Sequence, residues 1–341
     1  MSKSNSISWE LIPEKNYVII SPYLIPLNSQ KKVNIGDGFI MDSAVKLIGA
    51  KPKAVFSSRV ELSDKQIAII NDSQLILVAG ANTLKDNFEI TPNFDSILLK
   101  KIKIPIALCG LGHFGNIEQT KNGLNSKSIE VVTEILKRFP YISVRCDESR
   151  RYLTRSLTDK AESILMTSCP VVYSVDDMNK KFSSQVNFNH LVVTITDRAY
   201  IEKQIKILEV GPKLFPSRRI TLALHQDYGN APLWSLAKKL GYEIFRSDSY
   251  EDFIDLYRDA DMHFGNRLHA HLKCISLGVR TFLTPFDLRQ SFFAESLDFP
   301  LVSKIPNPDL QTYDFNRLLL KRNSAEVNMV KFLDSVRSLI N

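Results

Sequence analysis

Short apolar runs rich in β-branched residues recur along the chain, and between them apolar residues return every three or four positions. In the first half of the chain the runs predict six strands, at residues 16–24, 53–58, 74–80, 104–112, 141–146 and 164–169. The segment 128–139 shows the helical spacing, with Val131 and Ile135 on one side. Strands that are apolar throughout and alternate with helices are typical of βαβ units, so we expect a parallel sheet with helices on both faces.

A polar stretch at residues 174–189, rich in Ser, Asn and Asp, interrupts this alternation as a linker would. Five more strands are predicted after it, at residues 190–196, 219–226, 242–247, 260–265 and 279–286. We therefore expect an α/β protein with two Rossmann-like, doubly wound domains facing each other across a cleft, residues 1–175 and 190–341, joined by a linker at 176–189. A last helix near residues 324–340 could pack on either domain.

Net charge, cysteine spacing and the length of the apolar runs limit the ligands, metal sites and location that we expect. The formal net charge of +7 favours anionic partners, but no long Lys/Arg run or RNA-binding signature is present, so we expect a small anionic ligand and no nucleic acid. The four cysteines form no C-x-x-C pair, which argues against a zinc site and a disulfide framework. The chain shows no signal-peptide pattern and no run of roughly 18 apolar residues, so we expect a cytoplasmic protein with at most peripheral membrane contact.

Candidate site residues follow the predicted strands, because ligands of doubly wound sheets bind beyond the carboxyl ends of the strands. After the first strand comes NIGDGF, in which Gly36 and Gly38 are expected to turn the backbone tightly and Asp37 to stand at a helix N-cap. Asp37 is then either a simple cap or a hydrogen-bond acceptor or base in the cleft. The segment lacks the G-x-G-x-x-G pattern of dinucleotide-binding folds.

Two further strand ends carry polar residues. The turn GLGHFGN could approach a phosphate through the amides around Gly112 and His113, although a solvent-facing His113 is an equal alternative. The fifth strand ends in VRCDES, where Arg145 stands at the edge of the sheet and calls for an anionic partner. Asp147 is expected to cap the helix that follows.

The segment DMHFGNRLHAH places cations where a helix begins. With Asn266 as the expected N-cap, Arg267 and His269 fall in the first turn, where the helix dipole disfavours positive charge. That conflict disappears if a phosphate or carboxylate binds there. His269 and His271 lack the i,i+4 spacing of helical metal ligands, so we expect no metal.

The order NIGDG, GAN, VRCDES and DADMHFGNRLHAHLKCISLGVRTF resembles the polysaccharide pyruvyltransferase family over roughly residues 16–290. The resemblance implies a GT-B-like fold and transfer of the pyruvate moiety of phosphoenolpyruvate onto a sugar diol as a ketal, in the synthesis of a bacterial surface polysaccharide or glycolipid. It implies phosphoenolpyruvate as co-substrate without another cofactor, and a sugar acceptor that is lipid-linked at the inner face of the membrane in many members. The first domain would hold the acceptor and the second the donor.

The resemblance also implies roles for individual residues. His269, whose imidazole titrates near neutrality, is the expected proton donor, and Asp37 is a candidate base for the acceptor. Four residues are implied in donor binding: Arg145, Arg267, Leu268 and Arg289. Cleft loops add six candidates: Asn34, Gly36, Gly80, Asn82, Gly112 and His113. We expect Asp37 and Arg145 on one wall of the cleft, with Arg267, His269 and Arg289 on the other.

Two positions depart from the family pattern. Ala79-Gly80-Ala81 replaces a run of glycines, and Cys169-Pro170 replaces an Asp-Pro pair; both bear on acceptor recognition. One alternative is a GT-B glycosyltransferase that uses a nucleotide sugar, with Arg267 and Arg289 holding a diphosphate. Another is a non-catalytic anion-binding protein.

Overall fold

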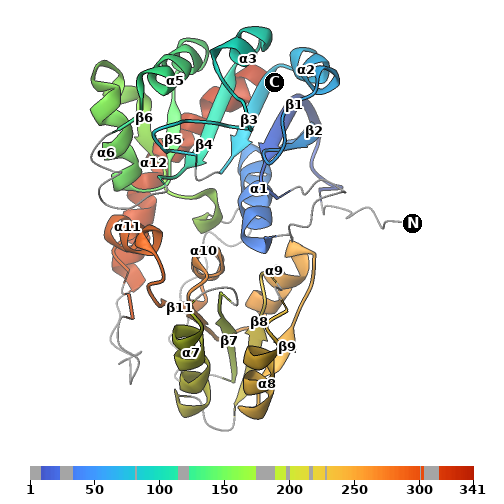
Figure 1. Ribbon diagram of the computed structural model, residues 1–341, viewed down its shortest axis with the longest axis vertical. Coiled ribbons are helices and arrows are strands. Elements are labelled where there is room, and N and C mark those ends of the chain that lie inside the picture. The colour runs from blue at the N-terminus through green and yellow to red at the C-terminus, as the bar shows by residue number, and fades with distance from the viewer. Residues whose placement is uncertain are drawn as a thin grey trace.

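The computed structural model describes residues 9–23, 34–80, 83–113, 123–173, 189–196, 200–214, 218–226, 229–299, 301–302 and 315–341. These residues form two parallel sheets, of six and five strands, which lie one above the other along the long axis of the molecule (Figure 1). Every predicted strand is present, so the expected α/β class is confirmed. Apart from Asn189, the proposed linker lies outside the described residues.

The first sheet has the strand order β2-β1-β3-β4-β5-β6. Its strands are β1 Glu14–Ser21, β2 Lys51–Ser57, β3 Leu75–Ala79, β4 Ile106–Leu111, β5 Ile142–Val144 and β6 Ile164–Met166. Its helices are α1 Ile35–Ile48, α2 Asp64–Asn71, α3 Ser96–Lys101, α5 Ser126–Arg138 and α6 Asp147–Ser156, with short 3-10 helices η1 Thr158–Ser163 and η2 Pro170–Val172. The central strands β3 and β4 are buried along their whole length, as their unbroken apolar sequence requires.

The second sheet has the strand order β11-β10-β7-β8-β9. Its strands are β7 His190–Thr194, β8 Arg219–Ala223, β9 Glu243–Phe245, β10 Met262–Gly265 and β11 Arg280–Leu283. The helices of this half are α7 Ile201–Leu214, α8 Ala231–Lys239, α9 Tyr250–Arg258, α10 Leu268–Ser276 and α11 Leu288–Leu297. In each sheet the order reverses beside the first strand of that sheet, which is the point where doubly wound folds bind ligands.

The last helix, α12 Phe315–Ile340, departs from the expected division at residue 190. Although it follows the second sheet in the chain, it packs against β1, β3, β5 and β6 of the first (Figure 1). Its inward face is apolar, with Phe332 stacked edge-on against Phe139, and Arg337 donates to the carbonyl of Ile48 at the end of α1. The apolar face of α12 thus completes the core of the first half.

The two halves meet closely where α1 packs on α9 and α10, and two glycines permit the approach. A Cβ on Gly36 would lie 2.6 Å from Nδ1 of His269, and a Cβ on Gly38 would lie 2.9 Å from the ring of Tyr250 on α9. The expected tight turn is therefore wrong: both glycines are helical, and they leave room for side chains of neighbouring elements. The amide of Ile35 also donates to the carbonyl of His225, which follows β8 of the second sheet.

Candidate active site

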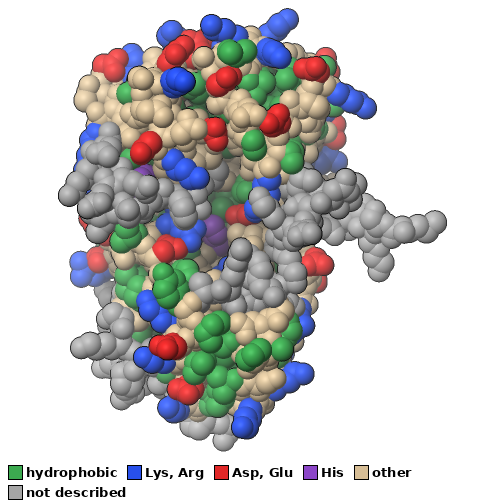
Figure 2. Space-filling view, viewed as in Figure 1, with side chains coloured by type: hydrophobic (Ala, Val, Ile, Leu, Met, Phe, Trp, Pro, Cys, Tyr) green, Lys and Arg blue, Asp and Glu red, His purple; other side chains and the backbone are tan. Residues whose placement is uncertain are grey.

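A cavity of about 690 Å³ lies between the strand ends of the first sheet and the start of α10. Figure 2 shows it as a hollow between the two halves, with basic, acidic and histidine side chains at its edge. Five residues expected from the sequence line it: Asn34, Asp37, Gly80, Arg145 and His269. Strand ends far apart in the sequence thus contribute to one site.

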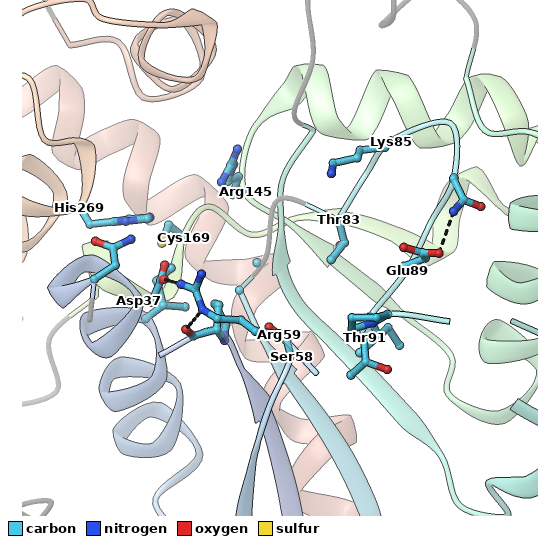
Figure 3. A pocket seen from close by; sticks show the side chains of 18 of the residues that line it. Asp37, Ser58, Arg59, Thr83, Lys85, Glu89, Thr91, Arg145, Cys169 and His269 are labelled. Atoms are coloured by element: carbon cyan, nitrogen blue, oxygen red, sulfur yellow. Dashed lines mark hydrogen bonds and ion pairs between the residues drawn. The ribbon is translucent and has the colours of Figure 1, made fainter. Parts of the chain in front are cut away.

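His269 enters the cavity from the first turn of α10 (Figure 3). The helix begins one residue later than expected, because Arg267 and not Asn266 is its N-cap. The Asn266 side chain is buried and donates to Gln204 at 2.9 Å, so it is engaged in fixing the end of β10. Leu268, for which the resemblance implied donor binding, packs into the apolar core.

The imidazole of His269 is neutral in this environment. Burial, together with the positive charges of Arg145, Arg289 and Arg267, lowers its pKa to about 3. The expectation of a ring titrating near neutrality is therefore wrong for these surroundings. Among the described residues, nothing hydrogen-bonds to Nε2 of His269, which leaves that atom able to meet a ligand.

Arg145 is a buried cation at the end of β5, with 4% of its surface exposed. Its guanidinium lies against the backbone of Gly112, where a Cβ would be 1.9 Å from Cζ, and it donates to the carbonyl of His113 at 3.2 Å. Burial lowers the pKa of Arg145. No carboxylate pairs with it within the described parts of the chain. A buried guanidinium without a counterion favours an anionic ligand.

The other two expected arginines stand behind the wall of the cavity. Arg267 donates to the carbonyl of Ile195 at 3.0 Å and to the side chain of Gln226 at 3.2 Å. Arg289 is paired with Asp287, the N-cap of α11, at 2.9 Å. Neither arginine is among the described residues that line the cavity. Of the three residues expected on the wall from the second half, His269 alone lines the cavity. Arg267 and Arg289 lie behind it and contribute positive charge.

Asp37 lies in the first turn of α1, next to the glycine on which His269 packs, and lines the same end of the cavity as His269 (Figure 3). The expected N-cap role falls instead to Asn34, whose side chain accepts from the amide of Gly36. Arg59 donates to Oδ2 of Asp37 at 3.1 Å and to the carbonyl of Pro22 at 2.7 Å. Burial raises the pKa of Asp37, and the charge of Arg59 opposes that rise. Arg59 thus holds a buried carboxylate in a fixed position on the wall of the cavity.

Several residues of the cavity were not predicted from the sequence. Arg59 follows β2 and Gln226 follows β8, so the rule that pointed to Asp37 would also have found them. The segment after β3 contributes further polar side chains without any motif: Thr83, Lys85, Asn87, Glu89 and Thr91. Cys169, one of the departures from the family pattern, also lines the cavity, and burial raises its pKa to about 11.

Other expected loop residues have supporting places. His113 is buried, at 2% exposure, against the ring of Tyr152, so the solvent-facing alternative is wrong. Gly112 accommodates the guanidinium of Arg145. Asn82 lies outside the described residues. Asp147 is the first residue of α6 rather than its cap, which is Cys146.

The described residues contain no group of three or more His, Cys, Asp or Glu side chains that could hold a metal ion. The four cysteines, Cys109, Cys146, Cys169 and Cys274, are buried free thiols. No helix in the described part of the chain is long and apolar enough to cross a membrane.

Several solved structures are similar to this chain at low sequence identity. UDP-GlcNAc 2-epimerase from Neisseria meningitidis, bound to UDP-GlcNAc, is similar with a TM-score of 0.50 and 11% identity, over 94% of this chain and 98% of that one. The epimerase from Rickettsia bellii has a TM-score of 0.48 and 15% identity, over 96% of each chain. A variant of the wall teichoic acid polymerase TagF has a TM-score of 0.44 and 13% identity, over 96% of this chain and 85% of that one. The two-sheet arrangement is GT-B-like, as expected.

A search of curated protein sequences returned no match. The family model described as polysaccharide pyruvyl transferase matches residues 34–285, well over half of the chain. The match runs from the start of α1 to the residues after β11, and so includes Asp37, Arg145 and His269. The chain therefore belongs to the polysaccharide pyruvyl transferase family.

Proposed function

We propose that this transferase moves the pyruvyl group of phosphoenolpyruvate onto two hydroxyls of one sugar, forming a ketal and releasing phosphate. The product would be a bacterial surface polysaccharide or glycolipid. The family supports transfer to a polysaccharide acceptor. The observation that carries the choice of donor is the pair formed by Arg145, buried without a carboxylate partner, and the neutral His269 at the start of α10 in the same cavity.

The end of the cavity that holds Arg145 is positively charged and therefore suits a donor with two anionic groups. Phosphoenolpyruvate carries a carboxylate and a phosphate, and the guanidinium of Arg145 can bind either in a bidentate way. The first amides of α10 would receive the other, because a helix N-terminus attracts anions. Arg267 and Arg289 add positive potential from behind. The bound anion would offset the cost of burying Arg145.

His269 would supply the proton for the methylene carbon of the donor. An anion bound beside the ring opposes the charges of the arginines, so we expect the pKa of His269 to rise when the donor binds. The imidazolium then donates to the methylene carbon while a sugar oxygen bonds to the central carbon. The second sugar oxygen displaces phosphate from that carbon, and its proton leaves with the phosphate. All atoms of phosphoenolpyruvate and the sugar diol are thus found again in the ketal and the released phosphate.

Asp37 would accept the proton of the first sugar hydroxyl. Burial raises the pKa of this carboxylate, which makes it a stronger base, and Arg59 fixes the orientation of its oxygens. The base and the acid would then both stand at the Arg145 end of the cavity, the base on α1 and the acid on α10 (Figure 3).

A binding comparison tests the proposal. We expect phosphoenolpyruvate to raise the melting temperature of the purified protein, because a ligand that binds only the native state stabilises it. Nucleoside diphosphates serve as the comparison. A protein stabilised by uridine diphosphate and not by phosphoenolpyruvate would instead be a nucleotide-sugar glycosyltransferase. Phosphate release in the presence of sugar acceptors then tests turnover.

We also propose that the protein acts at the inner face of the cytoplasmic membrane, on an acceptor attached to a lipid carrier. The net charge of +7 would give weak peripheral attraction to anionic lipids. Sedimentation with anionic vesicles at low and at physiological salt measures this, and binding that does not respond to salt would contradict an electrostatic origin.

A further inference from the structure

The cavity has two chemically different ends. At one end stand Arg145, His269 and the Asp37–Arg59 pair, and at the other lies the segment between β3 and α3 (Figure 3). The cation of that segment, Lys85, also lines the cavity and lies toward Arg145 in Figure 3. The other four polar side chains of the segment form what we call the polar wall: Thr83, Asn87, Glu89 and Thr91. None of these four side chains has a role in the donor chemistry proposed for the cavity.

The segment that carries the polar wall is irregular but anchored. Leu84, Phe88 and Ile90 are buried in the core of the first half, each with at most 2% of its surface exposed. The amide of Phe88 donates to Ser128 of α5 at 2.8 Å. Apolar anchors thus alternate with polar side chains along the segment, so that the polar groups are held at fixed positions.

Two hydroxyls of the polar wall have unused hydrogen-bonding capacity. Thr91 is only 1% exposed, and neither its hydroxyl nor that of Thr83 has a hydrogen-bond partner among the described residues. A buried hydroxyl without a partner costs free energy, so such groups are usually found where a ligand or water meets them. A hydroxyl can donate one bond and accept others, which suits the mixed donors and acceptors of a sugar.

Glu89 gives the polar wall its charge. Its carboxylate accepts from the side-chain amide of Asn87 at 2.9 Å, and no cation is paired with it within the described ranges. A carboxylate with free lone pairs binds neighbouring sugar hydroxyls strongly, and it repels a carboxylate or phosphate. The anionic donor is therefore favoured at the arginine end of the cavity and disfavoured at this one.

From this arrangement we propose that the polar wall is the acceptor subsite and that it selects an uncharged sugar over an acidic one. This proposal rests on the proposed function, because it assigns the second substrate of the same cavity. Asn87 and Glu89 are exposed at the mouth, so the rest of the acceptor extends into solvent. The subsite thus recognises one sugar unit of a longer molecule.

The test measures sugar binding apart from turnover. Saturation-transfer NMR is performed with methyl glycosides of neutral hexoses and of the matching uronic acids, with and without phosphoenolpyruvate. We expect the neutral glycosides to bind more tightly than the uronic acids. Glu89→Gln should weaken the neutral glycosides about tenfold or more, and should reduce the discrimination against uronic acids. Glu130→Gln, an exposed change on α5 away from the cavity, should have no effect.

Thr91→Val separates recognition from folding. The substitution keeps the shape of the side chain and removes a hydroxyl that has no partner among the described residues, so the free energy of unfolding should not fall. Binding of neutral glycosides should weaken roughly threefold to tenfold. A loss of stability without a loss of sugar binding would assign Thr91 a structural role only and would count against the proposal.

Three results would overturn the acceptor subsite: no binding of any neutral glycoside, binding that is unchanged in Glu89→Gln, or tighter binding of the uronic acids. Thermal shift with phosphoenolpyruvate is measured on the same samples. If phosphoenolpyruvate binds to wild type but the glycosides give any of these three results, the acceptor subsite is wrong and the proposed function is not affected. If the donor fails to bind, the proposed function is wrong, whatever the glycosides show.

Discussion

The ring of His269 packs directly on Gly36, so that a Cβ on this glycine would lie 2.6 Å from Nδ1 of the histidine. Side-chain atoms do not approach that closely, so any residue larger than glycine must displace the ring. The first turn of α1, in the NIGDG segment of the first half, therefore sets the orientation of the proposed acid of the second half.

Gly36→Ala should lower turnover by about 10- to 100-fold, because small displacements of a catalytic group are costly. The variant should still fold, since alanine favours a helix by about 1 kcal/mol over glycine. The control is the same change in a His269→Ala background. If Gly36→Ala acts through the ring, the double variant loses no more activity than His269→Ala alone. Additive losses in phosphate release would contradict this.

Arg145→Met should change stability and donor binding in opposite directions. Methionine keeps much of the volume of the arginine side chain and removes the buried guanidinium, which lies over the ring of Phe293 and lacks a carboxylate partner. The free energy of unfolding should stay the same or rise by about 1 kcal/mol. Affinity for phosphoenolpyruvate should fall about 10- to 100-fold.

Urea unfolding and donor titration measure the two effects of Arg145→Met. Arg151→Met is the matched control, because this arginine is exposed on α6 and forms a surface pair with Glu148. It should alter either quantity by no more than about 0.5 kcal/mol. If Arg145→Met destabilises the protein strongly and leaves donor affinity intact, the arginine has a structural role.

Arg59→Met should move the acid limb of the activity profile to higher pH. The charge of Arg59 holds down the pKa of Asp37 against the effect of burial, so its removal lets that pKa rise. A base with a higher pKa is protonated, and inactive, up to a higher pH. Arg59→Lys keeps the charge and should shift the limb less. An unchanged pH profile in Arg59→Met would remove Asp37 as the base.

Much of the fold could be predicted from the sequence, because strands covered on both faces must be apolar throughout. The runs that became β3, β4 and β7 show this directly. The side of the molecule on which α12 packs could not be predicted, since an amphipathic helix shows which face is buried but not which sheet receives it.

The site was predicted where a side chain follows a strand end. Asp37, Arg145 and His269 were found in this way, and Arg59 could have been. Thr91 could not be found, because its position depends on how an irregular segment is anchored by its buried residues. The role of Gly36 was misjudged for a related reason: a glycine chosen for close packing looks the same in sequence as one chosen for a turn.

Acid should destabilise the protein partly through His269. The pKa of this histidine lies near 3 in the folded chain and near 6.5 when unfolded, so the unfolded state binds more protons between these values. Its contribution to stability is therefore complete above pH 6.5 and is lost as the pH falls toward 3. From pH 7 to pH 5, His269→Gln should lose about 2 kcal/mol less free energy of unfolding than wild type. Equal losses in urea titrations at the two pH values would contradict a neutral, buried ring.

Donor binding should load a proton onto His269. The arginines that lower its pKa are the groups that a bound anion would neutralise, so binding and protonation are coupled. Calorimetric titration of phosphoenolpyruvate in buffers of different ionisation enthalpy measures the protons taken up. Wild type should take up more protons than His269→Gln near neutral pH, and the difference between the two cancels any protons bound by the donor phosphate itself. The variant should keep donor affinity and lose about 10²- to 10⁴-fold in turnover. If both proteins take up the same number of protons, or if His269→Gln turns over normally, the histidine is not the acid, and the start of α10 serves only to bind the anion.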